Sequence, residues 1–169
     1  SAVVYGNLCL YLHNQVSVLA PWRHYIDGKE IPNWEKFDTQ QPFYVHRIEL
    51  LRACIQPDPR NTLVSLWRYM FHDIPLQYQV TREALRLIDK QSIDIVCLGE
   101  LYALSWLGRQ LRKKRDLPVL HYIHGEEITA PSMYRLYGRK AIAGLRDAEG
   151  IVAVSSFTQS VLISKRIDK

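Results

Sequence analysis

The sequence has few cysteines and no long hydrophobic run, and each shortage excludes a class of protein. Its three cysteines, Cys9, Cys54 and Cys97, lack the spacing of metal ligands. Cys9 and Cys97 stand among apolar neighbours, so we expect reduced, buried thiols in a cytoplasmic protein. The apolar run at 93–98 is far too short to span a bilayer, and no charged-then-apolar signal segment opens the chain. The sequence therefore predicts a soluble protein.

Repeats, low-complexity stretches and linkers rich in proline or glycine are also absent, which favours one domain. With 47% hydrophobic and 23% charged residues, the 169-residue chain has enough apolar material for a single core. Its 22 basic and 17 acidic residues give a net charge of +5. This excess favours anionic partners such as phosphates or an acidic membrane surface, but it does not by itself indicate nucleic acid, and we expect none as a partner.

The first half of the chain predicts helices and two strands. Hydrophobic spacing indicates a helix over 2–12 and strands over 16–20 and 43–48. Between the strands, residues 22–41 are polar and contain Gly28 and Pro32, which predicts a long surface loop. Residues 62–71 favour a helix without a clear period, whereas 76–89 predict a helix with one apolar face.

The second half alternates regularly between strands and helices. Short apolar strands are predicted at 93–98, 118–123 and 151–154, with amphipathic helices at 102–114 and 132–147. Ser155 or Ser156 is expected to cap a last helix. Such an alternation is typical of a parallel sheet covered on both faces. The predicted fold class is therefore α/β, a Rossmann-like doubly wound parallel sheet.

Ligands of an open parallel sheet bind beyond the carboxyl ends of its strands. This rule selects five loops, each with a residue that can hydrogen-bond or carry charge: Pro21-Trp22-Arg23, Arg47 with its neighbours, Gly99-Glu100-Leu101, His124-Gly125-Glu126-Glu127 and Ser155-Ser156. Strand alternation leaves His124 as the first residue beyond its strand, which suits a functional imidazole. Its alternative role, capping a helix or bonding a backbone carbonyl, stays open on spacing alone.

His121 lies in the middle of the same predicted strand, so we expect a hydrogen-bonded core or half-buried histidine. His121 and His124, together with Glu126 and Glu127, suggest a metal site as an alternative. A closed metal site needs ligands that converge, and strand alternation separates the two histidines. We therefore expect no metal here.

The segment YIHGEE, followed by RKAIAGLRDAEGIVAVSSFT, resembles the N-terminal domain of family 4 glycosyltransferases. That family has a strand ending in a His-Gly-x-Glu-like turn, then a helix, Ala-Asp, an apolar strand and Val-Ser-x-Phe-Thr; here Asp147 and Ala148 stand in swapped order. Upstream, VSVLAP, FYVHRI and DIVCLGELYALSWLGRQLR resemble the second, third and fourth strands of the family. The turn is similar to the His-Gly-His-Glu of phosphatidylinositol-mannoside mannosyltransferases.

The resemblance implies the GT-B fold and a retaining transfer of a sugar from a nucleotide-sugar donor to a hydroxyl acceptor, a glycan or a lipid-linked sugar, without an obligatory metal or other cofactor. It assigns His124 to the histidine beside the transferred sugar, Gly125 to the close backbone approach and Glu127 to the acid of the turn. The other substrate-binding residues expected at the strand ends are Glu126, Gly99, Glu100, Arg47, Trp22 and Ser155.

By the same resemblance, the chain begins inside the first helix and stops before the second Rossmann domain. We therefore expect an acceptor-side fragment that shares its nucleotide-sugar with a missing C-terminal domain and is inactive alone. Without the first strand, a gap is expected between the second and fourth strands. Two alternatives stay open, a non-catalytic Rossmann-like binding or interaction module and a metal-dependent hydrolase.

Two segments have a membrane interpretation beside a structural one. The basic stretch consists of Arg109, Arg112, Lys113, Lys114 and Arg115, and it predicts either a solvated helix end or contact with an anionic membrane. Trp67, Tyr69 and Phe71, with Arg68, form a second membrane candidate, although we expect most of that apolar surface in the core. A cytoplasmic protein, peripheral to the inner face of the membrane, would fit either.

Overall fold

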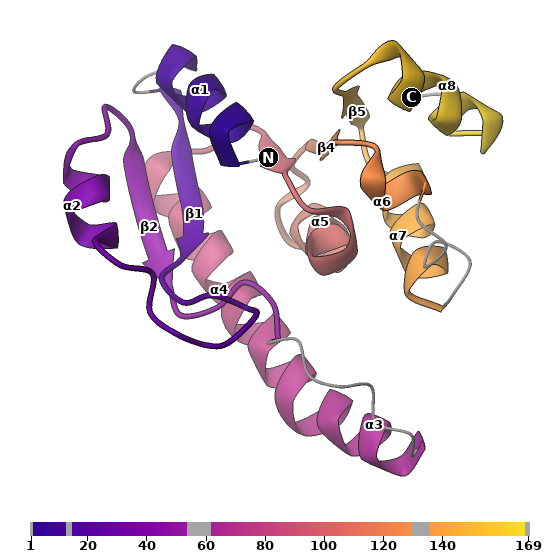
Figure 1. Cartoon of the computed structure of the whole chain (residues 1–169), viewed down its shortest axis with the longest axis horizontal. Helices are drawn as coiled ribbons and strands as arrows, with labels where there is room; N and C mark the ends of the chain where they lie inside the picture. Colours follow the sequence, from indigo (N-terminus) through magenta and orange to yellow (C-terminus); the bar gives the residue numbers. More distant parts are fainter. Residues whose placement is uncertain (1, 13–14, 54–61, 130–135, 168–169) are drawn as a thin grey trace. The chain divides into compact units, whose positions relative to one another are not determined.

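The computed structural model describes residues 2–12, 15–53, 62–129 and 136–167. The chain divides into two compact units, Ser1–Ser92 and Ile93–Lys169, and each is described by itself (Figure 1). Cys54 and the first turn of the helix predicted at 132–147 lie outside the described residues. The prediction of one domain stays a prediction.

The first unit is built on two parallel strands. β1 (Ser17–Pro21) pairs with β2 (Tyr44–Ile48), with Ser17 opposite Tyr44 and Pro21 opposite Ile48. Helix α1 (Ala2–Leu12) precedes β1, and a short helix α2 (Trp34–Thr39) lies between the strands in the sequence. Since the pair is parallel, both strands end at the same edge, next to Trp22 and Arg47.

A long helical run completes the first unit. It consists of α3 (Thr62–Arg68), the π-helical segment η2 (Tyr69–Asp73) and α4 (Ile74–Gln91). The π turn precedes Pro75, which lacks an N–H and disfavours regular α-helical geometry over the preceding turn. α4 contacts both strands. Its buried residues recur at helical spacing and form the core of this unit: Val80, Thr81, Ala84, Leu87 and Ile88.

The predicted strands of this unit and the helix at 2–12 are confirmed. The uninterrupted loop predicted at 22–41 is wrong, because it contains α2 and a bridge between Arg23 and Glu30. Trp34 Nε1 donates to Glu30 Oε1 at 3.0 Å, a contact that polarity alone does not predict. The helices predicted at 62–71 and 76–89 form one run rather than two separate elements.

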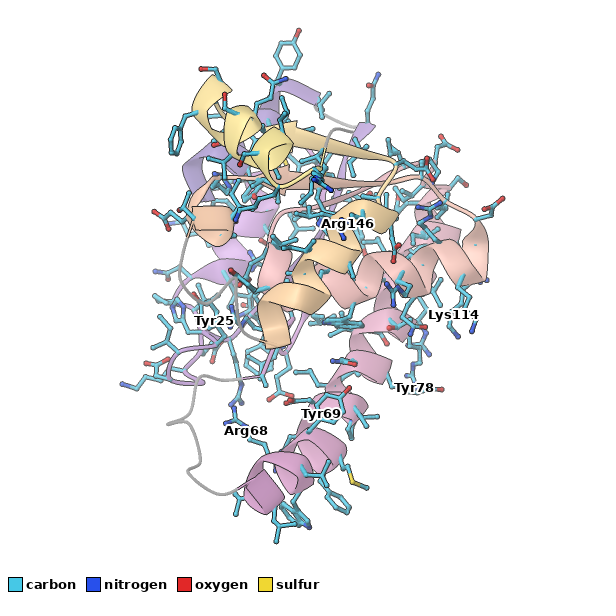
Figure 2. The ribbon with its side chains drawn as sticks, turned by 90° about the vertical axis from the view of Figure 1, so that its right-hand side faces the viewer. Tyr25, Arg68, Tyr69, Tyr78, Lys114 and Arg146 are labelled. Atoms are coloured by element: carbon cyan, nitrogen blue, oxygen red, sulfur yellow. The ribbon has the colours of Figure 1, made fainter. Side chains whose placement is uncertain are left out.

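The expectation that the aromatic residues at 67–71 belong to the core is also wrong. Trp67 is 61% exposed and Phe71 56% exposed. The physical reason is that α3 has its main contacts with η2, its own continuation, rather than with the sheet. Figure 2 shows Arg68, Tyr69 and Tyr78 along this run.

The second unit has three parallel strands in the order β3–β4–β5. They are β3 (Val96–Leu98), β4 (Val119–Ile123) and β5 (Gly150–Ala153). The helices are α5 (Leu101–Arg115), the short α6 (Glu126–Thr129), α7 (Leu136–Asp147) and α8 (Ser156–Ser164). This alternation confirms the α/β, Rossmann-like class predicted from the sequence.

The core of the second unit lies between its helices and one face of the sheet. Val119, His121 and Ile123 of β4 are buried, whereas Leu120 and Tyr122 on the other face are half-buried. α5 and α7 pack closely, since a Cβ added at Gly144 would lie 2.7 Å from Ser105 Cβ. The main apolar cluster consists of Leu101, Ile123, Ile128, Ala141, Leu145, Leu162 and Ile167.

The cysteine prediction needs correction. Cys9 and Cys97 are outside any disulfide, but Cys9 is half-buried and Cys97 is exposed. Successive residues of a strand point to opposite faces, so the burial of Leu98 turns Cys97 the other way. Burial raises the pKa of the Cys9 thiol above its ordinary value.

Candidate active site

The turn after β4 is closed by its own glutamate. Glu127 Oε2 accepts hydrogen bonds from the backbone N–H groups of His124 and Gly125, each at 3.2 Å. Gly125 has φ +105°, a left-handed conformation that favours glycine. Its carbonyl oxygen accepts from Thr129 Oγ1 at 3.0 Å and from the backbone N–H of Ile128 at 3.1 Å, which starts α6. The turn therefore has a backbone fixed by internal bonds.

His124 leaves β4 directly after the buried Ile123. The imidazole is half-buried, and its ring centroid lies 5.2 Å from that of Tyr122 with the planes tilted by 54°. The structure thus places His124 at the carboxyl end of the middle strand, the position from which side chains meet ligands in parallel sheets. Glu126, the first residue of α6, is exposed beside it.

A second turn lies against the first. Ser155 caps α8, because its Oγ accepts from the backbone N–H of Thr158 at 3.2 Å. The hydroxyl oxygens of Ser155 and Thr158 are 3.0 Å apart. A Cβ added at Gly125 would lie 2.9 Å from Thr158 Oγ1, so the two turns are in direct contact. The predicted cap of the last helix is confirmed, with Ser155 rather than Ser156 as the capping residue.

The loop after β3 reaches the same edge. Glu100 is the N-cap position of α5 and has extended backbone angles, with its carbonyl oxygen accepting from the N–H of Leu104 at 3.1 Å. Gly99 and Glu100 are half-buried. Tyr102 Oη donates to the carbonyl oxygen of Glu127 at 2.5 Å, which joins α5 to the His124 turn. The three strand ends of the second unit are therefore joined by contacts at the turn that carries His124.

In the first unit, the two predicted site residues, Arg47 and Trp22, form hydrogen bonds within the protein. Arg47 Nε and Nη2 donate to the two carboxylate oxygens of Asp38 at 2.9 and 2.7 Å, and Nη1 donates to the carbonyl oxygen of Pro21 at 2.6 Å. Trp22 N donates to the carbonyl oxygen of Ile48 at 2.8 Å, and the Arg23 guanidinium lies 4.5 Å from the Trp22 ring centroid. These contacts fasten α2 and the strand ends, so their role in substrate binding stays a prediction.

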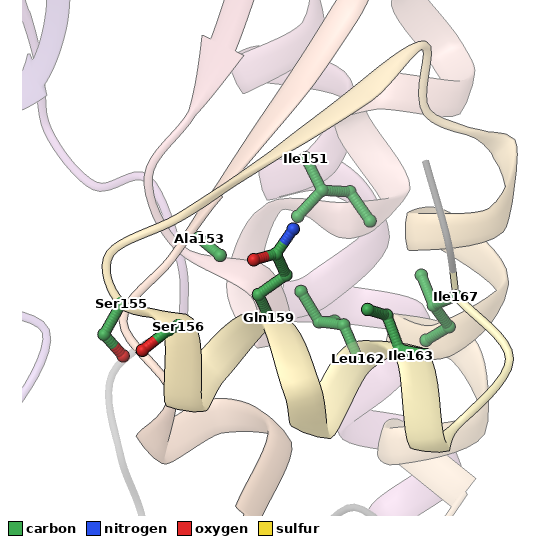
Figure 3. A pocket seen from close by; sticks show the side chains of 8 residues that line it. All are labelled: Ile151, Ala153, Ser155, Ser156, Gln159, Leu162, Ile163 and Ile167. Carbon is green, nitrogen blue, oxygen red and sulfur yellow. The ribbon is translucent and has the colours of Figure 1, made fainter.

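A cavity of about 520 Å³ adjoins the Ser155 turn (Figure 3). Its lining comes mainly from β5 and α8, with Ser155 and Ser156 at one end and the Gln159 amide among apolar side chains, and polar atoms contribute more of its surface than apolar ones. The remaining lining residues are Ile151, Ala153, Leu162, Ile163 and Ile167. Such a hollow offers apolar contact and a few polar groups beside the strand ends.

His121 is 1% exposed, which confirms its predicted place in the core, but the expectation of a hydrogen-bonded imidazole is wrong for one nitrogen. Within the described residues, Nδ1 has no hydrogen-bond partner. The side chain faces α5, where a Cβ added at Gly108 would lie 3.7 Å from Nε2. Desolvation by burial lowers its pKa to about 4, so the imidazole is neutral at physiological pH.

The metal alternative lacks a ligand set in the described part of the chain. Across residues 2–12, 15–53, 62–129 and 136–167, no group of three or more His, Cys, Asp or Glu side chains could hold a metal ion. The same ranges contain no helix that is both long and apolar enough to cross a membrane.

The basic stretch is partly neutralised. Arg109 forms an ion pair with Asp147, and Arg112 Nη2 lies 2.6 Å from Glu149 Oε1. Arg109, Arg112 and Arg146, with Asp147, line a groove of about 370 Å³. The last three residues of α5 are exposed, as expected for a solvated helix end: Lys113, Lys114 and Arg115.

Sequence reasoning missed three residues that shape the His124 turn, namely Tyr102, Thr129 and Thr158. Thr158 carries a weak signal, since it stands three residues after the capping Ser155, where a side chain meets the cap. Tyr102 and Thr129 donate hydrogen bonds to backbone carbonyl oxygens of the turn, and such bonds leave no pattern in one sequence.

Parallel strands alternating with helices, with a histidine turn and a capped serine turn at their carboxyl ends, define a Rossmann-like α/β protein with a ligand-binding edge. The model of the family described as Glycosyltransferase Family 4 matches residues 7–169. The chain belongs to this family. No curated protein matches the sequence.

One solved structure supports the fold. The chain is similar to Arabidopsis thaliana UGT89C1 complexed with UDP, with a TM-score of 0.55 at 13% identity. The likeness covers 97% of this chain and 46% of that one, so the chain spans less than half of its structural neighbour. A protein of unknown function from Vibrio parahaemolyticus RIMD 2210633, VPA0982, matches with a TM-score of 0.35 at 12% identity over 85% of this chain and 94% of that one.

Proposed function

We propose that this chain is the acceptor-side half of a retaining glycosyltransferase that transfers a sugar from a nucleotide-sugar to a hydroxyl acceptor, a glycan or a lipid-linked sugar. The observation that carries the proposal is His124, set on a fixed turn at the carboxyl end of β4 in a chain of glycosyltransferase family 4. The structural neighbour is complexed with UDP, which supports a nucleotide-sugar as donor here.

The imidazole of His124 suits this chemistry. In a retaining transfer through an oxocarbenium-like state, charge develops on the departing phosphate, and donors placed there in advance stabilise it. A hydrogen bond from the imidazole to a sugar hydroxyl or to that phosphate would hold the reacting atoms in place. The Gly125 backbone would allow the sugar a close approach. Glu126, Gly99, Glu100 and Ser155 surround this position as candidate substrate-binding groups.

We propose further that the donor is shared with a second Rossmann-like domain and that the chain alone is inactive. The likeness covers 46% of the structural neighbour, which supports this division. Expression of the 169-residue chain should therefore give protein without sugar transfer, and addition of the partner domain should restore it. Activity of the chain by itself would contradict the division.

His124→Ala in the whole enzyme tests the catalytic assignment. Loss of one positioned donor to transition-state charge costs roughly 100- to 1000-fold in kcat. We expect a loss of that size, with the thermal midpoint unchanged, measured as sugar transfer from a labelled nucleotide-sugar. His124→Gln, which keeps a donor, should recover part of the rate. Unchanged transfer by His124→Ala would end the catalytic assignment of this histidine.

We also propose a cytoplasmic protein, peripheral to the inner face of an anionic membrane, where a lipid-linked acceptor would reside. The supporting observation is an exposed helical stripe, here called the α3–η2 apolar face. Its members follow one another along a single helical run, in which the Trp67 and Phe71 ring centroids lie 4.7 Å apart and the His72 ring lies 6.4 Å from that of Trp67. The members of this face are Leu63, Val64, Leu66, Trp67, Met70 and Phe71, each more than half exposed.

Vesicle flotation tests the membrane partner. The whole protein should float with vesicles of phosphatidylcholine and phosphatidylglycerol, and less with phosphatidylcholine alone. Trp67→Ser with Phe71→Ser should reduce flotation about tenfold or more, since each aromatic ring contributes substantial apolar area. Ile26→Ser, at a residue 64% exposed in another loop, is the matched control and should float normally. Absence of flotation with both vesicle types, or a dimer that the double variant dissociates, would contradict a lipid partner.

A further inference from the structure

The turn that carries His124 is held from two sides by side chains of the protein itself. On one side, a single oxygen of Glu127 accepts the N–H groups of His124 and Gly125, each at 3.2 Å. On the other side, Thr158 Oγ1 lies 2.9 Å from the position that a Cβ of residue 125 would occupy. Both contacts act on the backbone next to the imidazole rather than on the imidazole.

The Glu127 carboxylate points back to its own turn. A charged acceptor bonds N–H groups more strongly than a neutral one, and both bonds end on the two residues that set the direction of the His124 side chain. Binding a sugar hydroxyl through this oxygen would compete with those bonds. Glu127 is half-buried and its carbonyl oxygen is bonded by Tyr102, so the residue is fastened at both ends.

Thr158 supports the turn from α8. It is 1% exposed, and its hydroxyl lies 3.0 Å from that of Ser155. The backbone of Gly125, with φ +105°, rests on this hydroxyl because residue 125 has no side chain. A shift of the turn toward α8 is therefore opposed by a buried hydroxyl that is itself within hydrogen-bond distance of Ser155 Oγ.

We propose that Glu127 and Thr158 are positioning residues that fix the His124 imidazole, and that neither touches the substrate. This inference rests on the proposed function, since it takes His124 as the catalytic group. It assigns Glu127 to support of the turn rather than to substrate binding. It also adds Thr158, which lies in α8 rather than in α6. The position of the imidazole then depends on two helices that follow neighbouring strands.

Glu127 is tested in the whole enzyme with Glu127→Ala and Glu127→Gln. Glu127→Ala should lower kcat on the order of tenfold, with the KM values for donor and acceptor within about twofold, because positioning acts on the transition state. Glu127→Gln keeps an acceptor and should recover most of the rate. A raised KM with normal kcat would show substrate binding and overturn the proposal. Asp94→Asn, which removes an exposed charge in the same unit, is the matched control and should have normal kinetics.

Amide resonances of the substrate-free enzyme give a second readout. With selective ¹⁵N-glycine and ¹⁵N-histidine labelling, the signals of His124 and Gly125 should shift in Glu127→Ala and stay in place in Asp94→Asn. A merely substrate-binding carboxylate would leave both signals unchanged without substrate, which would overturn the proposal.

Thr158→Val and Thr158→Ser test the other side of the turn. Valine keeps the shape and loses the hydroxyl, so kcat should fall about fivefold and the Gly125 signal should shift, whereas serine should restore both. Ser160→Ala on the same helix is the control. If Thr158→Val fails to fold, the Glu127 series still decides. If His124→Ala stays active while the amide signals of the turn shift in Glu127→Ala, only the catalytic assignment of His124 fails. If His124→Ala is inactive while those signals stay in place, only the positioning proposal fails.

Discussion

The two units bring polar residues to their strand ends in the same way and then use them differently. In the first unit, the Arg47 guanidinium donates to Asp38 and to the carbonyl oxygen of Pro21, so the candidate ligand itself is bonded inside the protein. In the second unit, the bonds from Glu127 go to the backbone N–H groups of His124 and Gly125, so they fix the turn that carries the imidazole. Topology brings polar residues to the strand ends of both units, and the bonds described there act on a side chain in the first unit and on the backbone in the second.

Gly125→Ala gives the largest expected effect, since it breaks the turn on which this difference depends. Alanine is strained at φ +105°, and its Cβ would lie 2.9 Å from Thr158 Oγ1. We expect the free energy of unfolding to fall by about 2–4 kcal/mol, measured by urea denaturation. Gly6→Ala in α1 of the first unit is the control. It has nothing within 4 Å of an added Cβ, and helix propensity should stabilise it by up to about 1 kcal/mol.

The pH dependence of the free energy of unfolding should report on His121, which is buried in the core of the second unit. Burial lowers the pKa of His121 from 6.5 to about 4, so the unfolded chain takes up this proton at a higher pH than the folded one. The contribution of the neutral imidazole is therefore fully present above pH 6.5 and is lost as pH falls toward 4. We expect a loss of about 3 kcal/mol across this window, measured by denaturation at a series of pH values.

His121→Leu should remove most of that slope, because leucine has no proton to bind. His24→Gln, at an exposed loop histidine of the first unit, should leave the slope unchanged. An equal slope in the His121 variant and the original protein would show that another group causes the acid sensitivity.

Arg47→Ala tests whether the bonds of the Arg47 side chain stabilise the first unit. It leaves Asp38, whose side chain is 15% exposed, without its bidentate partner, so we expect a loss of about 2–3 kcal/mol in unfolding free energy. The double change with Asp38→Ala should cost less than the sum of the single changes. In the whole enzyme, the acceptor KM should stay within about twofold if Arg47 is a fastener. A large rise in KM at unchanged stability would restore it as a substrate-binding residue.

The sequence predicted the alternation of strands and helices in the second unit because each strand there is short and apolar and each helix has one apolar face. It also placed His124 at its strand end and a cap at Ser155 or Ser156, since both follow from local periodicity and capping chemistry. It did not predict α2, in which Trp34 donates to Glu30, or the exposure of Trp67. Both depend on which residues a side chain contacts in the folded chain and not on its residue type.

The candidate site was less predictable than the fold for the same reason. Residue type marked Glu127 and Arg47 as polar groups at strand ends, but their bonds run to the backbone of their own turn and to an aspartate nine residues earlier. Thr158 was missed, because the contact of its hydroxyl with Gly125 joins two turns more than thirty residues apart in the sequence. Contacts of this kind need the folded chain.

The smallest effects are expected at two helix ends, one in each unit. Ser92 after α4 and Asp116 after α5 both have φ 51°, the left-handed conformation that glycine adopts without strain. Ser92→Gly should stabilise the protein by roughly 0.5–1 kcal/mol, and Asp116→Gly by less, because aspartate tolerates this conformation better than serine and glycine adds entropy to the unfolded chain. Thermal denaturation of both variants measures the difference. An equal or larger gain at Asp116 would mean that the helix end in the second unit is as strained as that in the first, and that the contrast between the units is confined to their strand ends.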